Sequence, residues 1–245
     1  MSPSLPPPHA AALHAEPLDA PRAQAIARAF LPARAWGNRY DYYYTRTKLS
    51  TDPLYPGVLE ALRQDDWPLL DIGCGLGLLA HALRADGQRQ PYLGLDIDRA
   101  KIPRARLAAE RAGLRQVRFD TGDAAALGHG HRGSIAILDV MHYLPPAAQG
   151  ALLGVAAAMM PDGARLVIRT PLAGDHVRGR TTRLVDRLAH VIGWMETLPR
   201  AYPSQEGLRA MLAAHGLQAQ FRPLYGRTPF NNWLVVAQRG GPAQA

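Results

Sequence analysis

Residues 69–77 read Leu-Leu-Asp-Ile-Gly-Cys-Gly-Leu-Gly. The first four residues are typical of a short buried strand. Gly73, Gly75 and Gly77 follow at alternate positions and predict a sharp turn that a ligand can approach without meeting a Cβ atom. The dinucleotide-binding fingerprint needs a further glycine where this chain has Leu78, so that match fails. Taken alone, the glycine run also fits an ordinary tight turn.

Strands and helices alternate along the rest of the chain. Short apolar runs predict strands at residues 69–72, 92–96, 116–119, 135–138 and 165–169, with a closing pair at 217–222 and 232–238. Apolar residues at helical spacing predict helices at residues 21–31, 78–84, 102–112, 147–160 and 207–215. This order predicts an α/β fold in which helices cover both faces of a mostly parallel sheet.

The sequence predicts one domain, at residues 21–239. Residues 1–20 are rich in Pro and Ala and predict a disordered arm, and residues 240–245 predict a loose tail. Residues 171–204 are too long for a plain connection. They predict a lid-like insertion with a helix at residues 181–195.

Composition excludes several classes of protein. The chain has 245 residues, of which 47% are hydrophobic and 20% charged, and its formal net charge is +8. Cys74 is the one cysteine, which excludes an internal disulfide and a cysteine-based zinc cluster, and we predict no metal site. No apolar run approaches the ~18 residues of a membrane span. The first residues lack a basic segment followed by an apolar core, so we expect a cytoplasmic location.

Acidic residues lie where three of the predicted strands end. Asp96 ends the second strand, Asp123 follows the third and Asp139 follows the fourth. Ligands of open α/β sheets bind beyond the carboxyl ends of the strands. A carboxylate at Asp96 is placed to accept hydrogen bonds from the ribose hydroxyls of a nucleoside, and Asp123 from an adenine amino group. Asp96 and Asp123 also each fit a helix N-cap.

Together these motifs resemble the class I S-adenosylmethionine-dependent methyltransferases, over roughly residues 69–169 and more loosely to residue 238. The resemblance implies a Rossmann-like sheet of seven strands with an antiparallel last strand, and S-adenosylmethionine as cofactor. It implies cofactor binding by Asp71, Gly73, Cys74, Gly75 and Gly77 at the methionine part, by Asp96 at the ribose, and by Gly122, Asp123 and Ala124 at the adenine, with Ile97 as a further cofactor-binding residue. It places Asp139 next to the sulfonium and the substrate.

Three further segments are similar to methyltransferases encoded with bacterial aryl-polyene pigment genes. They are residues 42–53, 139–145 and 228–232. None of the three strings is specific.

His142, Asp139 and Tyr143 are the candidate catalytic residues. A hydroxyl acceptor must lose a proton, and His142 is the best candidate base because an unperturbed imidazole titrates near neutral pH. His142 could instead only pack beside the cofactor, and Tyr143 could shape the pocket or simply fill space.

The tyrosine-rich segment before the glycine turn carries further candidates. A helix there would place Tyr40, Tyr44 and Lys48 on one face. Lys48 or Arg46 would then pair with the cofactor carboxylate, while Tyr43 or Tyr44 lines the acceptor pocket. The alternative is an aromatic face packed on the sheet edge.

Arginines supply the remaining candidates. Arg169 could face the acceptor or form a surface ion pair. The insertion carries Arg178, Arg180, Arg183 and Arg187, which could dock an acidic carrier protein or phosphate, or form a solvated face.

These features favour a methyltransferase that acts on a small molecule, either a hydroxylated aromatic or a carrier-bound acceptor. The catalytic thiolate of cytosine C5 methylation is absent, and the Asp/Asn-Pro-Pro-aromatic string of exocyclic base-amine methylation is replaced by residues 139–142. The net charge of +8 leaves an RNA methyltransferase as one alternative. The other is a non-catalytic cofactor-binding protein of the same fold.

Overall fold

The computed structural model describes residues 16–34, 36–124, 130–173, 200–226 and 231–240. Its helices are α1 (Ala20–Ala27), α2 (Tyr40–Thr51), α3 (Leu54–Ala61), α4 (Leu78–Ala85), α5 (Lys101–Arg111), α6 (Pro146–Met159) and α8 (Gln205–Ala214), with the 3₁₀ turns η1 (Arg28–Phe30) and η3 (Met141–Tyr143). Its strands are β1 (Leu69–Ile72), β2 (Tyr92–Asp96), β3 (Val117–Thr121), β4 (Ser134–Leu138), β5 (Leu166–Pro171), β6 (Leu217–Pro223) and β7 (Asn232–Arg239).

The strands form one seven-stranded sheet in the order β3-β2-β1-β4-β5-β7-β6. The pairs among β3, β2, β1, β4 and β5 are parallel. The last strand, β7, lies between β5 and β6 and is antiparallel to both. The expected Rossmann-like sheet with a reversed last strand is therefore confirmed.

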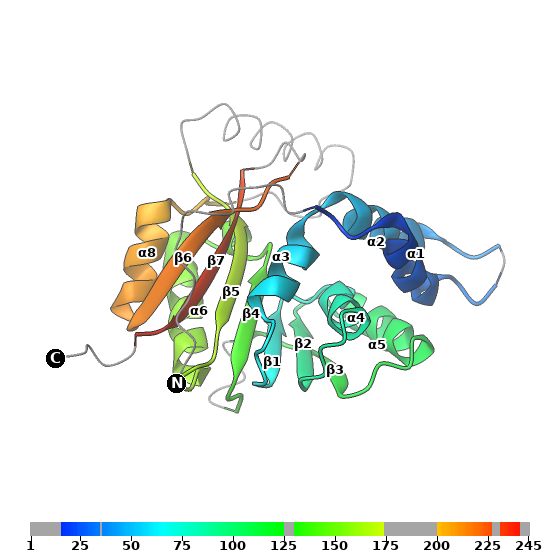
Figure 1. The fold of residues 1–245 in the computed structure, drawn as a ribbon, viewed down its shortest axis with the longest axis horizontal. Coiled ribbons are helices and arrows are strands. Elements are labelled where there is room, and N and C mark those ends of the chain that lie inside the picture. Colours follow the sequence, from blue (N-terminus) through cyan, green and yellow to red (C-terminus); the bar gives the residue numbers. More distant parts are fainter. Residues whose placement is uncertain (1–15, 35, 125–129, 174–199, 227–230, 241–245) are drawn as a thin grey trace.

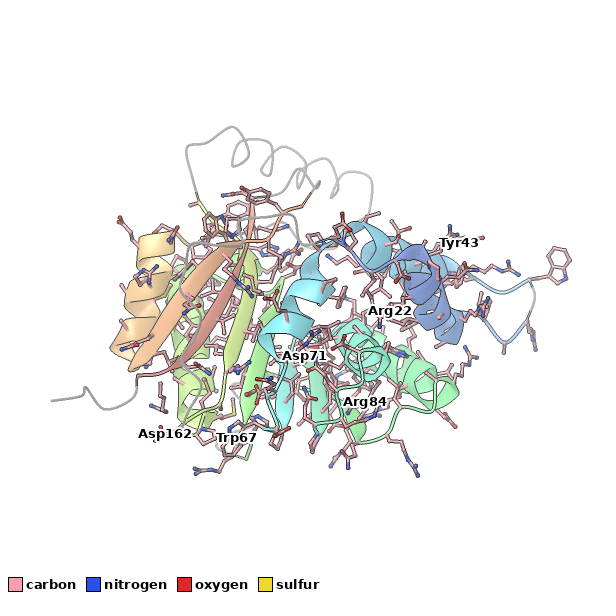
Figure 2. All side chains as sticks on the ribbon, in the orientation of Figure 1. Arg22, Tyr43, Trp67, Asp71, Arg84 and Asp162 are labelled. Atoms are coloured by element: carbon pink, nitrogen blue, oxygen red, sulfur yellow. The ribbon has the colours of Figure 1, made fainter. Side chains whose placement is uncertain are left out.

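Helices cover both faces of the sheet (Figure 1). Along β1, Leu69 packs into a hydrophobic cluster with residues of α1, α3, α4 and α5, whereas Leu70 and Ile72 pack into a second cluster with residues of α6 and α8. The side chains of a strand alternate between faces, so a strand that is apolar throughout needs a cover on each side. Figure 2 shows Trp67 and Asp162 at the edge where β1 and β5 begin, and Tyr43 on α2 toward the other edge.

The structure differs from the sequence prediction at several element boundaries. Helix α3 was not predicted. Strand β3 continues to Thr121, and β5 continues to Pro171, so Arg169 lies within β5 and does not end it. The predicted disordered arm also ends earlier than expected, because Leu18 is buried and donates its backbone N–H to the Leu49 carbonyl at 3.1 Å.

Some predictions lie outside the described residues. They are the disordered arm at residues 1–15, the tail at 241–245, and the part of the insertion at residues 174–199 with its four arginines. The flanks of the insertion are described: Ala173 donates its backbone N–H to the Pro203 carbonyl at 2.9 Å. Within the described part of the chain, no helix has both the length and the apolar character needed to cross a membrane.

Candidate active site

The glycine turn after β1 is closely packed on two sides and open at its centre. Gly73, Gly75 and Gly77 all have positive φ angles, of 77°, 56° and 76°. A Cβ atom on Gly73 would lie 2.3 Å from Val140, and one on Gly77 would lie 2.4 Å from Phe119. A Cβ atom on Gly75 would meet nothing within 4 Å. The turn therefore needs glycine for its backbone conformation, and Gly75 leaves room for a ligand.

Asp96 ties the glycine turn to the end of β2. One carboxylate oxygen accepts the backbone N–H of Gly75 at 2.8 Å, and the other accepts that of Asp98 at 2.8 Å. Helix α5 begins only at Lys101, and its first residues are not capped by Asp96. The N-cap alternative for Asp96 is therefore wrong. A carboxylate can accept about four hydrogen bonds, so Asp96 keeps capacity for ligand hydroxyls.

The neighbouring candidates flank this carboxylate. Ile97 is 77% exposed, directly after Asp96. Gly122 donates its backbone N–H to the Asp96 carbonyl at 3.1 Å, which brings the end of β3 beside the end of β2. Ala124 is buried and Asp123 is exposed. Ile97 is thus an exposed apolar side chain directly beside the carboxylate of Asp96.

Asp71 lies in the interior, below the glycine turn (Figure 2). Its Oδ2 accepts the hydroxyl proton of Tyr92 at 2.5 Å, whereas its Oδ1 is buried and has no hydrogen-bond partner. Burial raises the pKa of Asp71 to about 7. The hydrogen bond from Tyr92 lowers this pKa, and the nearby charge of Asp96 raises it. Cys74 packs close by, with its sulfur 2.8 Å from the position of a Cβ atom on Gly94.

Four charged side chains form a closed ring, which we call the charge ring, at the ends of β4 and β5. It consists of Lys48 from α2, Asp52 directly after α2, Asp139 after β4 and Arg169 from β5. Lys48 Nζ donates to Asp52 at 2.6 Å and to Asp139 at 3.3 Å. Arg169 donates through Nη2 to both oxygens of Asp52, at 3.0 and 3.1 Å, and through Nη1 to both oxygens of Asp139. Each cation thus contacts each carboxylate.

Attraction within the charge ring outweighs the cost of burial. Burial opposes the charged form of Lys48, but Asp139 and Asp52 raise the pKa of its amine to about 12. Burial would raise the pKa of Asp139, but Arg169 and Lys48 hold it well below its usual range. Asp139 also has a positive φ of 60°, a conformation that non-glycine residues rarely adopt. The ring therefore holds an ionised carboxylate in a strained position.

His142 lies on η3, three residues after Asp139. Its ring is buried between two tyrosines: the ring centroid of Tyr143 is 4.1 Å away, and that of Tyr202 is 6.3 Å away with nearly parallel planes. Nδ1 of His142 is buried without a hydrogen-bond partner. Burial lowers the pKa of His142 to about 4, although Asp139 acts in the opposite direction. The imidazole is therefore neutral near pH 7.

Gln149 on α6 fixes the turn that carries His142. Its side-chain amide donates to the carbonyls of Met141, Leu144 and Ala201, each at 3.0 Å. The His142 carbonyl in turn accepts the backbone N–H groups of Arg200 and Ala201, at 2.8 and 3.2 Å. The flank that follows residues 174–199 is thus anchored next to η3.

Helix α2 carries the tyrosines predicted to line the acceptor pocket. The rings of Tyr40 and Tyr44 stack with centroids 6.1 Å apart, which confirms a shared helix face. Tyr43 and Tyr44 are 52% and 43% exposed, so they do not form a buried packing surface. Arg46 is exposed, whereas Lys48 points into the charge ring.

The structure gives Arg169 a different place from either of its predicted ones. It is 3% exposed, so the surface ion pair is wrong, and its guanidinium is bound to Asp52 and Asp139. Arg169 therefore holds the carboxylate of Asp139 in position from within the protein interior.

Sequence reasoning missed Asp52, Tyr55 and Tyr92. Asp52 lies four residues after Lys48, a spacing at which opposite charges meet on a helix, and that signal was available. Tyr55 is buried on α3, and its pKa is raised first by burial and then by nearby groups that include Asp52. No group of three or more potential ligand side chains that could hold a metal ion occurs among the described residues.

Comparison with known families agrees with this architecture. A family model described as "Methyltransferase domain" matches residues 24–220. The chain belongs to this family. It is a methyltransferase enzyme whose cofactor is S-adenosylmethionine. No curated protein matches the chain.

Solved structures of several methyltransferases share the fold. Magnesium protoporphyrin IX methyltransferase from Synechocystis PCC 6803, with bound SAH, has a TM-score of 0.62 and 18% identity, over 87% of this chain and 92% of that one. An O-methyltransferase family protein from Burkholderia thailandensis has a TM-score of 0.62 and 19% identity, over 91% and 68%. An O-methyltransferase family 2 protein from Planctomyces limnophilus, in complex with apigenin, has a TM-score of 0.62 and 20% identity, over 88% and 66%.

Proposed function

We propose that the enzyme methylates a hydroxylated aromatic small molecule, free or bound to a carrier, with His142 as general base. The observation that carries the proposal is a neutral imidazole, buried between two tyrosine rings, with one nitrogen unpaired. The methyltransferase family and the small-molecule methyltransferases of the same fold support it. The proposal includes the cytoplasmic location that the sequence favours.

The unpaired nitrogen of His142 defines where the proton would go. A buried N–H group without a partner is rarer and more costly than a buried lone pair without one. We therefore assign the proton of the neutral ring to Nε2 and the lone pair to Nδ1, a choice of tautomer that rests on this argument. Nδ1 is covered in the free protein, so His142 would accept the hydroxyl proton of the acceptor there once the acceptor displaces the side chains that cover it, and Asp139 would stabilise the resulting imidazolium. Tyr143 and Tyr202 would hold the aromatic acceptor against the imidazole.

The residues at the carboxyl ends of β1, β2 and β3 fit the cofactor. Gly75 has an open Cβ direction, Asp71 has an unpaired buried oxygen, and Ile97 is exposed beside a carboxylate. We propose that the glycine turn and Asp71 hold the amino-acid part, Asp96 the ribose, and Ile97 with Asp123 the adenine. When bound, S-adenosylmethionine supplies an electrophilic methyl group on a positively charged sulfur.

The outer half of the charge ring would face the same ligand. Lys48 has a third ammonium proton beyond its two bonds in the ring, which could pair with the cofactor carboxylate. Asp139 has 29% of its side chain exposed, and we propose that it faces the sulfonium. Arg46 is exposed on α2, whereas Lys48 lies in the charge ring. Lys48 is therefore the better placed of the two cations to pair with the cofactor carboxylate.

One finer assignment extends the proposal. The similarity of residues 42–53 and 139–145 to methyltransferases of aryl-polyene gene clusters supports a conjugated phenolic acceptor. In the structure these two segments meet, because Lys48 of the first donates to Asp139 of the second at 3.3 Å.

A screen with radiolabelled methyl donor tests the proposal. The acceptors are hydroxylated aromatics, carrier-linked acyl groups and bulk RNA. We expect label in a hydroxylated aromatic. The His142→Gln variant should lower turnover on that acceptor about 10²- to 10⁴-fold, the usual contribution of a general base, with cofactor affinity little changed. His131→Gln is the control, because His131 contacts the carbonyl of Ser134 at the start of β4, away from the site.

Other outcomes of the screen would replace the proposal. Label in RNA alone, with affinity that falls steeply as salt rises, would identify an RNA methyltransferase. Cofactor binding without transfer to any acceptor would identify a non-catalytic binding protein. Equal turnover of His142→Gln and wild type would remove His142 from the mechanism.

A further inference from the structure

The charge ring contains an inner pair and an outer pair. Asp52 and Arg169 have 8% and 4% of their side chains exposed, whereas Asp139 and Lys48 have 29% and 23% exposed. Ligands can therefore reach the outer pair but not the inner one. Both inner residues are nevertheless bound to both outer residues.

Stability alone does not explain a buried ring of this kind. Removing charges from water is costly, and well-packed apolar residues of similar size often stabilise a fold as well or better. The ring also holds Asp139 in a left-handed backbone conformation, which is typical of functional sites. Its position at the ligand-binding edge of the sheet points to a role in binding.

The formal charge of the ring is zero, because two cations balance two carboxylates. If Asp52 lost its charge, Lys48 and Arg169 would act on Asp139 alone, and the ring would carry one net positive charge. The potential beyond Asp139 would become more positive. A cationic ligand there would bind less tightly, and an otherwise similar neutral ligand would be affected much less.

The methyl donor and its product differ in charge at the sulfur atom. S-adenosylmethionine carries a positive sulfonium, whereas S-adenosylhomocysteine has a neutral thioether at the same atom. We propose that Asp52 is a positioning residue that keeps the charge ring neutral and so sets the preference of the site for the charged donor over the neutral product. The proposal rests on the proposed placement of Asp139 beside the sulfonium. In function, Asp52 would limit inhibition by the product.

Calorimetric titration of both compounds at one ionic strength tests this role without a methyl acceptor. The readout is the ratio of the two dissociation constants. Asp52→Asn should shift the ratio against S-adenosylmethionine by roughly tenfold, the effect of one unit charge about 10 Å away at an effective dielectric constant of about 20. Lys48→Met removes a positive charge and should shift the ratio in the opposite direction. The double variant restores neutrality and should return the ratio toward that of wild type.

This design separates charge from structure. Loss of the cofactor-carboxylate contact in Lys48→Met would weaken both compounds alike, so it does not change the ratio. If Asp52→Asn does not fold, the sign of the Lys48→Met shift and the behaviour of the double variant still decide the question. Asp65→Asn is the matched control: Asp65 is also a buried aspartate that accepts a backbone N–H two residues on, but it contacts Ser134 at the opposite end of β4.

The outcomes distinguish this inference from the proposed function. If wild type binds neither compound, the cofactor placement in the proposed function is wrong. If both bind and the ratio is the same in wild type, Asp52→Asn and Lys48→Met, the role of Asp52 is wrong while the placement stands. A shift of the ratio in Asp65→Asn equal to that in Asp52→Asn would also overturn the role of Asp52.

Discussion

Gly75 donates its backbone N–H to the carboxylate of Asp96 across 2.8 Å, which joins the turn after β1 to the end of β2. The bond fixes the distance between two parts of the site that the chain separates by 21 residues. A ligand that contacts both parts meets a surface that is already formed, so little ordering accompanies binding. The first two predictions concern these two residues.

Asp96→Ala should weaken the binding of S-adenosylmethionine by about 1.5–3 kcal/mol, the scale of hydrogen bonds to a charged group. Calorimetry gives the dissociation constant. Asp98→Ala is the control, because Asp98 is a nearby carboxylate that accepts the N–H of Ala100 in the turn before α5. An unchanged dissociation constant in Asp96→Ala, or an equal loss in Asp98→Ala, would contradict the ribose-binding role.

Gly75→Ala should fold but lose most of its cofactor affinity. Its positive φ costs an alanine about 1–2 kcal/mol, and the new methyl group would occupy space that the protein leaves open. Gly113→Ala is a matched control, since Gly113 has a φ of 60° and also has nothing within 4 Å of a Cβ atom. Thermal unfolding should show similar losses in both variants, and only Gly75→Ala should bind more weakly. Equal binding by the two variants would place the ligand elsewhere.

Cofactor affinity should rise with pH through about 7. Burial, the first of the causes, raises the pKa of Asp71 to about 7, so the free protein holds a proton there below that pH. A cationic ligand in the glycine turn favours the ionised carboxylate, so binding below pH 7 must release the proton and is weaker. Titrations at pH 6, 7 and 8 check this. Asp71→Asn should bind with nearly constant affinity over the same range, and a parallel pH dependence in both proteins would contradict the assignment.

His81 should make the fold sensitive to acid. It is 3% exposed on α4, its ring centroid lies 5.0 Å from that of Phe30, and its Nε2 has no hydrogen-bond partner. Burial lowers its pKa from 6.5 to about 4. Between these values the unfolded chain binds a proton that the folded chain does not. The contribution of neutral His81 is therefore complete above pH 6.5 and is lost as pH falls toward 4, by up to about 3 kcal/mol.

The His81→Leu variant isolates this effect. Denaturant unfolding at pH 8 gives the packing difference between variant and wild type, because the histidine is then neutral in both states. Toward pH 4.5 the unfolding free energy of wild type should fall more steeply than that of the variant. Two parallel curves would show that His81 does not titrate in this window.

Local patterns allowed the sheet to be predicted from the sequence, together with the grouping of the glycine turn and two carboxylates at one edge of it. Gly73, Gly75 and Gly77 form one turn, and Asp96 and Asp123 each follow a strand, so topology alone brings them to one edge. The end of β3 was predicted two residues short, because Asp120 and Thr121 are polar and exposed to different degrees on an edge strand. Such residues weaken the apolar pattern without ending the strand.

The charge ring could not be predicted in the same way. Lys48 and Asp139 are 91 residues apart, and Arg169 and Asp52 are 117 residues apart. Their contacts depend on where the end of α2 lies relative to β4 and β5, which hydrophobic periodicity does not specify. An arginine within a strand normally predicts an exposed side chain. Arg169 is buried because two carboxylates from other elements meet its guanidinium.

The single hydrogen bond between Ala173 and Pro203 has a practical consequence. It joins the described residues on the two sides of residues 174–199, while Gln149 independently binds Ala201 to the turn that carries His142. A segment of different length can replace the one between Ala173 and Pro203, because the free energy of closing a loop rises only slowly with the length of the loop. The corresponding segments of related methyltransferases can thus be grafted between Ala173 and Pro203 while the residues around His142 stay in place.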